Sequence, residues 1–419
     1  MRTSFVVNRS TAPYRTSEKM VSPCRSAVIL LTRGAMLGVI VCIAWTAAVA
    51  GETVAPPHGI YVYSYPRFVE SGEYERAMAV TGVDGAAVVM RWAEIEPRKA
   101  VFDFVELDRR IEMARSHGLS IELGILAGGN APEWLYEPAP TGVGAQRLNF
   151  VFSHHGGQGK TLAVAMAPPW DAAYLDAFAA LLAKVSEHLR STGAMAHVNV
   201  VKLTGINTDT DELRLPNETP EETGNAEVTD AVQTWSQAGY RPQRVVEAMR
   251  RVAAAWAVAF PSAWKVLPII PQKSFPPIGD RGRVHEGPQA AEAVRRLLKE
   301  LSRTAEAGNH GRFILQMDWL NADQPVRPHV MELARELGVP VAWQTNFYLG
   351  REGRGAGCGG RFGETSHCDA ASFLRLLESG IAPAGGSGVN ARGLFIEVFP
   401  PDVIEYGASI FKAHEEMLR

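Results

Sequence analysis

From residue 58 onward, short apolar runs alternate with longer segments whose apolar residues recur at helical spacing. Short apolar runs bounded by turn residues are typical of buried strands. Eight such runs cover residues 58–65, 85–92, 119–126, 197–206, 264–270, 312–319, 339–347 and 393–399. The segments between them predict helices over 104–118, 171–192, 241–260, 287–308, 327–338 and 367–380, with a last helix over 401–418.

Strand and helix alternating through about eight units predict an α/β protein with a single (β/α)8 TIM barrel over residues 51–419. A doubly wound open sheet is the alternative, because strand order cannot be deduced from sequence. Two long excursions, over 127–170 and 207–240, follow the third and fourth strands. Both leave the carboxyl end of a strand, where a barrel builds its active site.

The amino terminus predicts a signal peptide over residues 1–50. Arg25 and Arg33 precede the apolar stretch 35–50, which is shorter than the roughly 20 residues that a membrane span needs. Cleavage after Ala50 would make the protein secreted or periplasmic, without a membrane partner. An uncleaved anchor is the alternative, and translation could begin at Met20 or Met36. Outside this segment, Cys358 and Cys368 either close a disulfide or remain thiols.

Composition narrows the class of partner. The chain of 419 residues has a net charge of −3 and no recurring basic cluster, so nucleic acid is not expected as a partner. The histidines lack the spacing of metal ligands, and we predict neither a metal nor a cofactor. A small molecule or a polymer is the expected substrate, and the sequence leaves the oligomeric state open.

The stretch after the second predicted strand carries a recognisable set of residues. It resembles the corresponding segment of retaining (β/α)8-barrel glycoside hydrolases, especially the β-galactosidase-like and endoglycanase-like families, over about residues 60–135. The matching positions are Arg91, Trp92, Glu96, Pro97, Phe102, Asp103, Phe104, Leu107, Asp108, Gly118, Pro132, Glu133 and Trp134. The resemblance implies a barrel enzyme that cleaves a β-linked glycan with two carboxyl groups.

Both catalytic positions of the family pattern differ in this chain. The acid is a glutamate after an asparagine at the end of strand four, where this chain has Asn207 followed by Thr208. The nucleophile is a glutamate at the end of strand seven, where this chain has Gln344, which cannot serve as a carboxylate. The catalytic candidates are therefore the other acids near the predicted mouth, namely Glu212, Glu397, Asp318 and Asp209, with Asp211 beside them.

Each candidate also has a structural interpretation. Glu397 lies in an apolar strand, where burial raises a carboxyl pKa, and it could instead form a structural ion pair with Arg91. Asp209, Asp211 and Glu212 could simply be a solvated loop that caps a helix. Asp318 could cap a turn.

Aromatic and amide side chains at the predicted strand ends favour carbohydrate as the substrate. Flat rings can stack on pyranose rings, and amides can bind hydroxyl groups. Packing at the barrel ends would explain the tryptophans equally well. The predicted substrate-binding residues are Arg91, Trp92, Trp134, Asn207, Gln316, Trp319, Trp343, Gln344 and Asn346.

Three functions fit these patterns. The first is a secreted glycosidase with Glu212 or a neighbouring aspartate as acid and Glu397 or Asp318 as the second carboxylate. The second is a barrel that has lost the catalytic glutamates and only binds sugar. The third is a barrel lyase or isomerase in which the acids transfer protons.

Overall fold

The computed structural model describes residues 55–153, 161–270, 274–309, 311–318, 320–322, 328–345, 358, 368–381 and 393–418. The predicted signal peptide, the alternative start sites and two predicted binding residues, Trp319 and Asn346, lie outside these residues. In the described part of the chain no helix is long and apolar enough to cross a membrane. Cys358 and Cys368 form a disulfide, with their Cα atoms 5.5 Å apart. This is one of the two predicted alternatives.

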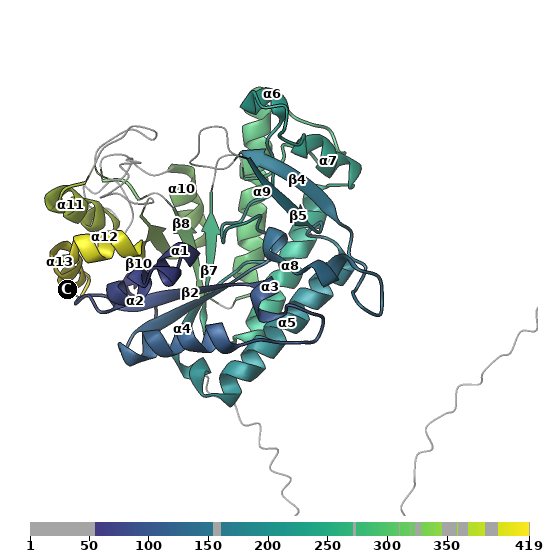
Figure 1. The fold of residues 1–419 in the computed structure, drawn as a ribbon. Coiled ribbons are helices and arrows are strands. Elements are labelled where there is room, and N and C mark those ends of the chain that lie inside the picture. Colours follow the sequence, from purple (N-terminus) through teal and green to yellow (C-terminus); the bar gives the residue numbers. More distant parts are fainter. Residues whose placement is uncertain are drawn as a thin grey trace, which may run out of the picture. The chain divides into compact units, whose positions relative to one another are not determined.

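Eight parallel strands close into a barrel, which confirms the (β/α)8 prediction over the open sheet (Figure 1). Each strand falls within one of the eight apolar runs. Around the barrel the order is β1, β10, β9, β8, β7, β6, β3 and β2, and β2 pairs with β1. The strands are β1 (Gly59–Val62), β2 (Gly85–Arg91), β3 (Ser120–Leu126), β6 (Val198–Lys202), β7 (Trp264–Ile269), β8 (Phe313–Met317), β9 (Val341–Gln344) and β10 (Gly393–Val398).

The predicted helices between the strands are present. They are α4 (Val105–Ser116), α5 (Ala172–Ser191), α8 (Pro242–Ala259), α9 (Gly287–Ala307), α10 (Pro328–Leu337) and α11 (Ala370–Ile381). Periodicity missed three short helices near the first two strands, α1 (Pro66–Glu70), α2 (Glu73–Met78) and α3 (Trp92–Ile95). Helices of this length span one or two turns, which is too short for a helical period to emerge.

The single helix predicted over 401–418 is wrong, because the structure has α12 (Pro400–Glu405) and α13 (Gly407–Met417) with a break at Tyr406. Tyr406 leaves helical geometry at φ −110° and ψ 33°. Its hydroxyl donates to the Cys368 carbonyl at 2.7 Å, and its ring stacks on Phe373. These tertiary contacts fix the break, and sequence periodicity cannot report them.

The two long excursions pack against each other beside the barrel. The first contains the short 3-10 turns η1 (Gly128–Asn130) and η2 (Glu133–Tyr136) and the hairpin of β4 (Leu148–Ser153) and β5 (Thr161–Met166). The second contains α6 (Pro220–Thr223) and α7 (Ala231–Gln237). Val151 and Thr229 join them, since Val151 N donates to the Thr229 hydroxyl at 2.9 Å and Thr229 N donates to the Val151 carbonyl at 2.8 Å. Figure 1 shows the hairpin next to α7.

The barrel interior has an apolar layer with a polar layer above it. The lower layer is a separate buried cluster of Tyr61, Val200, Val266, Ile314, Ala342 and Phe395. Because alternate residues of a strand share a face, the next inward positions toward the mouth lie two residues further on. On five of these strands they are polar, namely Tyr63, Lys202, Gln316, Gln344 and Glu397. The sequence thus places a polar network directly beneath the carboxyl ends of the strands.

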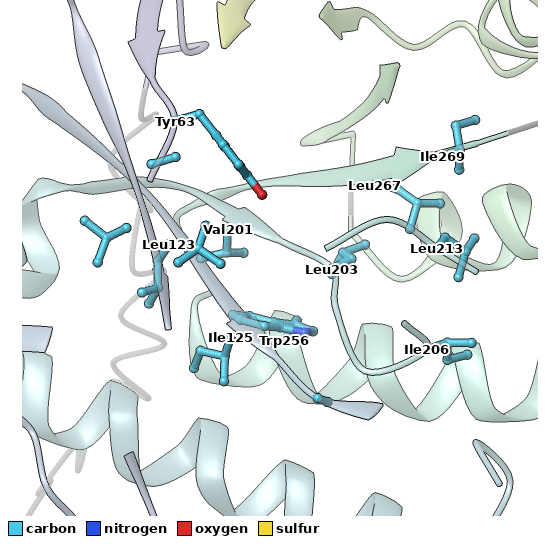
Figure 2. Close-up of a cluster of buried hydrophobic side chains, with 14 of the residues drawn as sticks. Tyr63, Leu123, Ile125, Val201, Leu203, Ile206, Leu213, Trp256, Leu267 and Ile269 are labelled. Carbon is cyan, nitrogen blue, oxygen red and sulfur yellow. The ribbon is translucent and has the colours of Figure 1, made fainter. Parts of the chain in front are cut away.

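The outward-facing residues of the same strands form the main core against the helices. Figure 2 shows part of this cluster, including Leu203 and Trp256. Trp256 of α8 also donates its indole N–H to the Thr204 carbonyl at 3.0 Å. The helix is thereby fixed against the end of β6, from which the candidate site begins.

Candidate active site

Lys202, the last residue of β6, lies at the centre of the polar layer and is fully buried. Its Nζ lies 2.7 Å from Oε1 of Glu397, 2.5 Å from Oδ2 of Asp211 and 3.9 Å from Oε1 of Glu122. Burial alone would lower the pKa of Lys202, but the charges of these carboxylates raise it well above its ordinary value. Lys202 is therefore a buried cation that connects three carboxyl groups from different parts of the barrel.

Glu397 of β10 is held on every side within the polar layer. Its Oε2 accepts hydrogen bonds from the side-chain amides of Gln316 at 2.6 Å and Gln344 at 2.8 Å, while Oε1 faces Lys202. The side chain is fully buried. Gln316 and Gln344, which were predicted to bind sugar hydroxyls, thus use their amides to hold a carboxylate.

The predicted ion pair of Arg91 and Glu397 is wrong. The Arg91 side chain is 50% exposed and pairs with Glu94 at 3.8 Å. Glu397 is in register with Tyr61, which is in register with Gly85, so Arg91 lies six residues further along its strand. At about 3.3 Å per residue this is a separation of roughly 20 Å in the strand direction. Lys202 reaches Glu397 across the barrel instead.

Glu122 of β3 is the third carboxyl group around Lys202 and is also fully buried. Burial raises its pKa well above the ordinary value, and the neighbouring charge of Glu397 raises it further. Both effects favour the protonated form of Glu122 in the folded protein.

Replacing Glu122 by glutamine is expected to remove a pH-dependent loss of stability. The folded protein holds the proton of this carboxyl to a higher pH than the unfolded chain, whose carboxyl has the ordinary pKa of 4.5. The contribution of Glu122 to stability is therefore complete below pH 4.5 and is lost as the pH rises toward the folded value. Urea unfolding across this range should show the variant gaining on the unaltered protein by up to about 1.4 kcal/mol per pH unit.

The exposed Glu112, paired with Arg115 on α4, provides the control for this comparison. Glu112→Gln should shift stability by a small amount that does not change with pH. A constant difference between Glu122→Gln and the unaltered protein would show that Glu122 is ionised in both states.

Glu212 and Asp318 form a hydrogen-bonded carboxyl pair nearer the mouth. Asp318 follows β8 two residues after Gln316, so its side chain points inward one step above the polar layer. Asp318 is buried, whereas Glu212 is half-buried. Burial raises the pKa of both carboxyl groups, and the negative charge of Asp211 raises both further. The hydrogen bond between them raises the pKa of Asp318 and lowers that of Glu212, so the proton of this bond lies on Asp318.

The loop from Asn207 to Leu213 carries these acids over the barrel. Asn207 accepts a hydrogen bond from Gly205 N at 3.0 Å and donates to the Thr210 carbonyl at 2.8 Å. Leu213 N donates to the Pro268 carbonyl of β7 at 2.8 Å. Asn207, predicted to bind substrate, is therefore buried and bonded to backbone groups that shape the loop.

A second loop approaches closely enough to require glycine. Gly129 N donates to the Thr208 carbonyl at 2.7 Å. A Cβ atom on Gly128 would lie 1.9 Å from the Asn207 carbonyl oxygen, and the φ of +55° also favours glycine. Asn130 donates to the Asp209 carbonyl at 3.0 Å. Asp209 thus belongs to the junction of the two loops, and its side chain is half-buried.

Three of the predicted sugar-stacking tryptophans lie in the core. Trp92 is fully buried against the rings of Trp134, Tyr174 and Phe178. Trp343 is also fully buried, because it alternates with the inward-facing Gln344 and points out of the barrel. The position expected for these rings at the mouth is therefore not observed, and hydrophobic packing accounts for them.

Glu96, which follows Arg91 and Trp92 in the motif after β2, has a structural role. Trp92 donates its indole N–H to Oε2 of Glu96 at 3.1 Å, and Ala100 N donates to Oε1 at 2.9 Å. Trp134 donates its indole N–H to the Glu96 carbonyl at 3.0 Å. Burial raises the pKa of Glu96, and these hydrogen bonds to its carboxylate offset part of the rise. Glu96 therefore links the segment after β2 to Trp134 in the segment after β3.

Lys202, Glu122 and Tyr63 were missed as site residues by the sequence analysis. A charged residue inside an apolar strand run was the available signal, because such a charge must find a partner when it is buried. That signal was applied to Glu397 but not to Lys202 or Glu122. Among the residues that the structure describes, no group of acids, histidines or cysteines is arranged to hold a metal ion.

The comparisons with known proteins point to one superfamily. Residues 71–198 match the family model of glycoside hydrolase family 42, described as β-galactosidase. The resemblance to barrel glycoside hydrolases is confirmed. The matched segment contains the Arg91–Trp134 motif, whereas Lys202, Glu212, Asp318 and Glu397 lie beyond it.

Two solved structures are among those to which the chain is similar. The catalytic domain of β-amylase from Paenibacillus polymyxa matches with 13% identity and a TM-score of 0.54, over 86% of this chain and 98% of that one. An intracellular xylanase from Thermoanaerobacterium saccharolyticum matches with 14% identity and a TM-score of 0.44, over 82% and 85%. No curated protein matches the chain in sequence. The β-amylase comparison supports the barrel fold over most of this chain.

Proposed function

We propose that the protein is an O-glycosyl hydrolase that cleaves a β-linked glycan, with the Glu212–Asp318 pair as its proton donor. One observation carries the proposal: two carboxyl groups with raised pKa values share a hydrogen bond at the carboxyl ends of the barrel strands. The match to a β-galactosidase family model supports carbohydrate as the substrate and a β-linkage as the bond.

The chemistry assigns different tasks to neighbouring acids. Glycoside hydrolysis needs one carboxylic acid to protonate the leaving oxygen and a carboxylate to assist attack at the anomeric carbon. In our proposal Glu212, the more exposed member of the pair, accepts the proton of Asp318 and passes it to the glycosidic oxygen as the carbon–oxygen bond breaks. Asp211 supplies negative charge beside the developing cation, water adds to the anomeric carbon, and the proton that this water loses returns to the Glu212–Asp318 pair.

Asp211 is held by two partners inside the barrel. Tyr63 donates its hydroxyl to Oδ1 at 3.0 Å, and Lys202 contacts Oδ2 at 2.5 Å. The two proposed roles thus fall on neighbouring residues with different partners, since Asp211 bonds to a hydroxyl and a cation whereas Glu212 bonds to another carboxyl group.

The test is hydrolysis of a panel of aryl glycosides and polysaccharides by residues 51–419. The panel compares the unaltered protein with Asp211→Asn, Asp318→Asn and the control Glu94→Gln, whose residue is exposed and pairs with Arg91. We expect turnover to be lost in the first two variants and kept in the control. Turnover that survives both Asp211→Asn and Asp318→Asn would exclude Asp211 and the Glu212–Asp318 pair from the reaction.

A sugar-binding barrel without catalysis is the second candidate. The observation that favours it is the immobilised Glu397, whose oxygens face Lys202, Gln316 and Gln344 rather than an open site. Glycan binding measured by calorimetry, together with no turnover on the panel, would favour this function over hydrolysis.

We also propose that the protein is exported and cleaved after Ala50. The predicted signal over residues 1–50 supports this, and so does the Cys358–Cys368 disulfide, since disulfides persist in oxidising compartments. Expression of the full chain should yield a product outside the cytosol whose amino-terminal residue is Gly51. A product that retains residues 1–50 at a membrane would instead indicate an anchor.

A further inference from the structure

We infer that Lys202 is a positioning residue, which holds the Asp211 carboxylate from inside the barrel and so fixes Glu212 against Asp318. This inference rests on the proposed function for its catalytic consequence, although its structural part can be tested without any substrate. Lys202 itself is buried beneath the loop, so it acts on the reaction through Asp211.

The contacts of Lys202 come from every side of the barrel interior. Glu122 of β3, Glu397 of β10 and Asp211 of the loop supply the carboxyl groups. Oε1 of Gln316 in β8 lies 3.4 Å from Nζ, and the ring of Tyr63, the residue after β1, has its centroid 5.0 Å from Nζ. A single ammonium group of β6 therefore contacts side chains of β3, β8 and β10 and the residue after β1, and it joins them to the loop above.

The amino group reaches the loop at the one residue that points down into the barrel. Within Asn207–Leu213 the other tight contacts are made mainly by backbone groups or within the loop itself. Asp211 alone extends its carboxylate to Tyr63 and Lys202. Glu212 follows it in the chain, so the position of Asp211 determines where the Glu212 side chain begins.

Several charged groups shift the pKa values of Glu212 and Asp318, and Lys202 contacts one of these groups, Asp211. Asp211 raises the pKa of both members, Arg214 lowers that of Glu212, and Lys202 lowers that of Asp318. A carboxylate at position 211 that lost its cation would be buried without a counter-charge, which is costly. We therefore expect it to take up a proton or leave the barrel, and either change alters the pair.

The test is hydrogen exchange of the Asn207–Leu213 amides in Lys202→Met, followed by mass spectrometry. Loss of a charge-assisted hydrogen bond should speed exchange in this loop by about tenfold or more. Lys265→Met is the matched control, because Lys265 is also a buried lysine of a barrel strand. Its Nζ donates to the Phe260 and Ala263 carbonyls near the start of β7, at 2.7 and 2.8 Å. That variant should leave loop exchange unchanged.

Activity supplies the second readout. If Lys202 only positions the acids, Lys202→Met should lower kcat on the hydrolysed glycoside while KM changes little, since Lys202 does not touch substrate. Faster loop exchange together with reduced kcat supports the inference. Unchanged exchange, or unchanged kcat, in a folded Lys202→Met protein overturns it.

Asp211→Asn keeps the test decisive if Lys202→Met does not fold. It preserves side-chain size and removes only the charge that Lys202 holds. Exchange over Asn207–Leu213 should again quicken, and an unchanged rate would overturn the inference. Should the panel show no hydrolysis by the unaltered protein, the proposed function fails, while the exchange data still decide whether Lys202 holds the loop.

Discussion

Glu212→Gln is expected to reduce hydrolysis of glycosides with poor leaving groups by about 10²- to 10⁴-fold, the usual contribution of a general acid. Glutamine keeps the size of the side chain and its ability to bond to Asp318, but it has no acidic proton to give. An alkyl or sugar leaving group needs that proton, because it departs poorly as an alkoxide. The measurement is kcat/KM for a series of substrates that differ only in the leaving group.

The same series contains its own control. A dinitrophenyl leaving group departs without protonation, so Glu212→Gln should retain much more activity on that substrate than on the alkyl glycoside. Glu133→Gln, at an exposed residue paired with Arg147, should behave like the unaltered protein on both. An equal loss on both substrates would mean that Glu212 is not the acid, and full retention on both would remove it from the mechanism.

Trp92→Ala is expected to lower the free energy of unfolding by about 3–5 kcal/mol, the usual cost of removing a large aromatic side chain from a core. The ring is fully buried among Trp134, Tyr174 and Phe178, and its N–H bonds to Glu96. Urea denaturation measures the change. Because this ring presents no face to solvent, glycan affinity of the variant that remains folded should match that of the unaltered protein.

Val105→Ala gives the stability control, since Val105 is a large apolar residue that is 75% exposed. Its unfolding midpoint should stay nearly unchanged. The opposite pattern for Trp92, with stability kept and glycan binding lost, would restore the stacking role that the sequence suggested.

The two tryptophan interpretations show where sequence patterns stop being informative. A tryptophan just after a strand can point into the mouth or pack behind it, and both positions give the same local pattern. Trp343 is the clearer case, because the inward position of Gln344 next to it fixes the outward direction of the ring. The outward direction of the Trp343 ring can be deduced only once Gln344 is seen to bond to Glu397 inside the barrel.

Glu397 marks a similar limit. Its place in an apolar strand indicated that it must be paired when buried, and the structure agrees on that requirement. The partner is Lys202 rather than Arg91, because strand register sets the level of every side chain along the barrel. The sequence indicates that a buried Glu397 needs a counter-charge, whereas strand register decides which residue supplies it.

The sequence by itself determined the eight strands, the long helices and the barrel, because apolar periodicity is a local property that each segment displays independently. It also supplied Asp211, Glu212, Asp318 and Glu397 as individual candidates, although not Glu122. Only the tertiary structure decided that Glu212 meets Asp318 and that Asp211 meets Lys202. Those contacts join the loop after β6 to side chains that the closed barrel brings inward from other positions, and no local pattern specifies which pairs will meet.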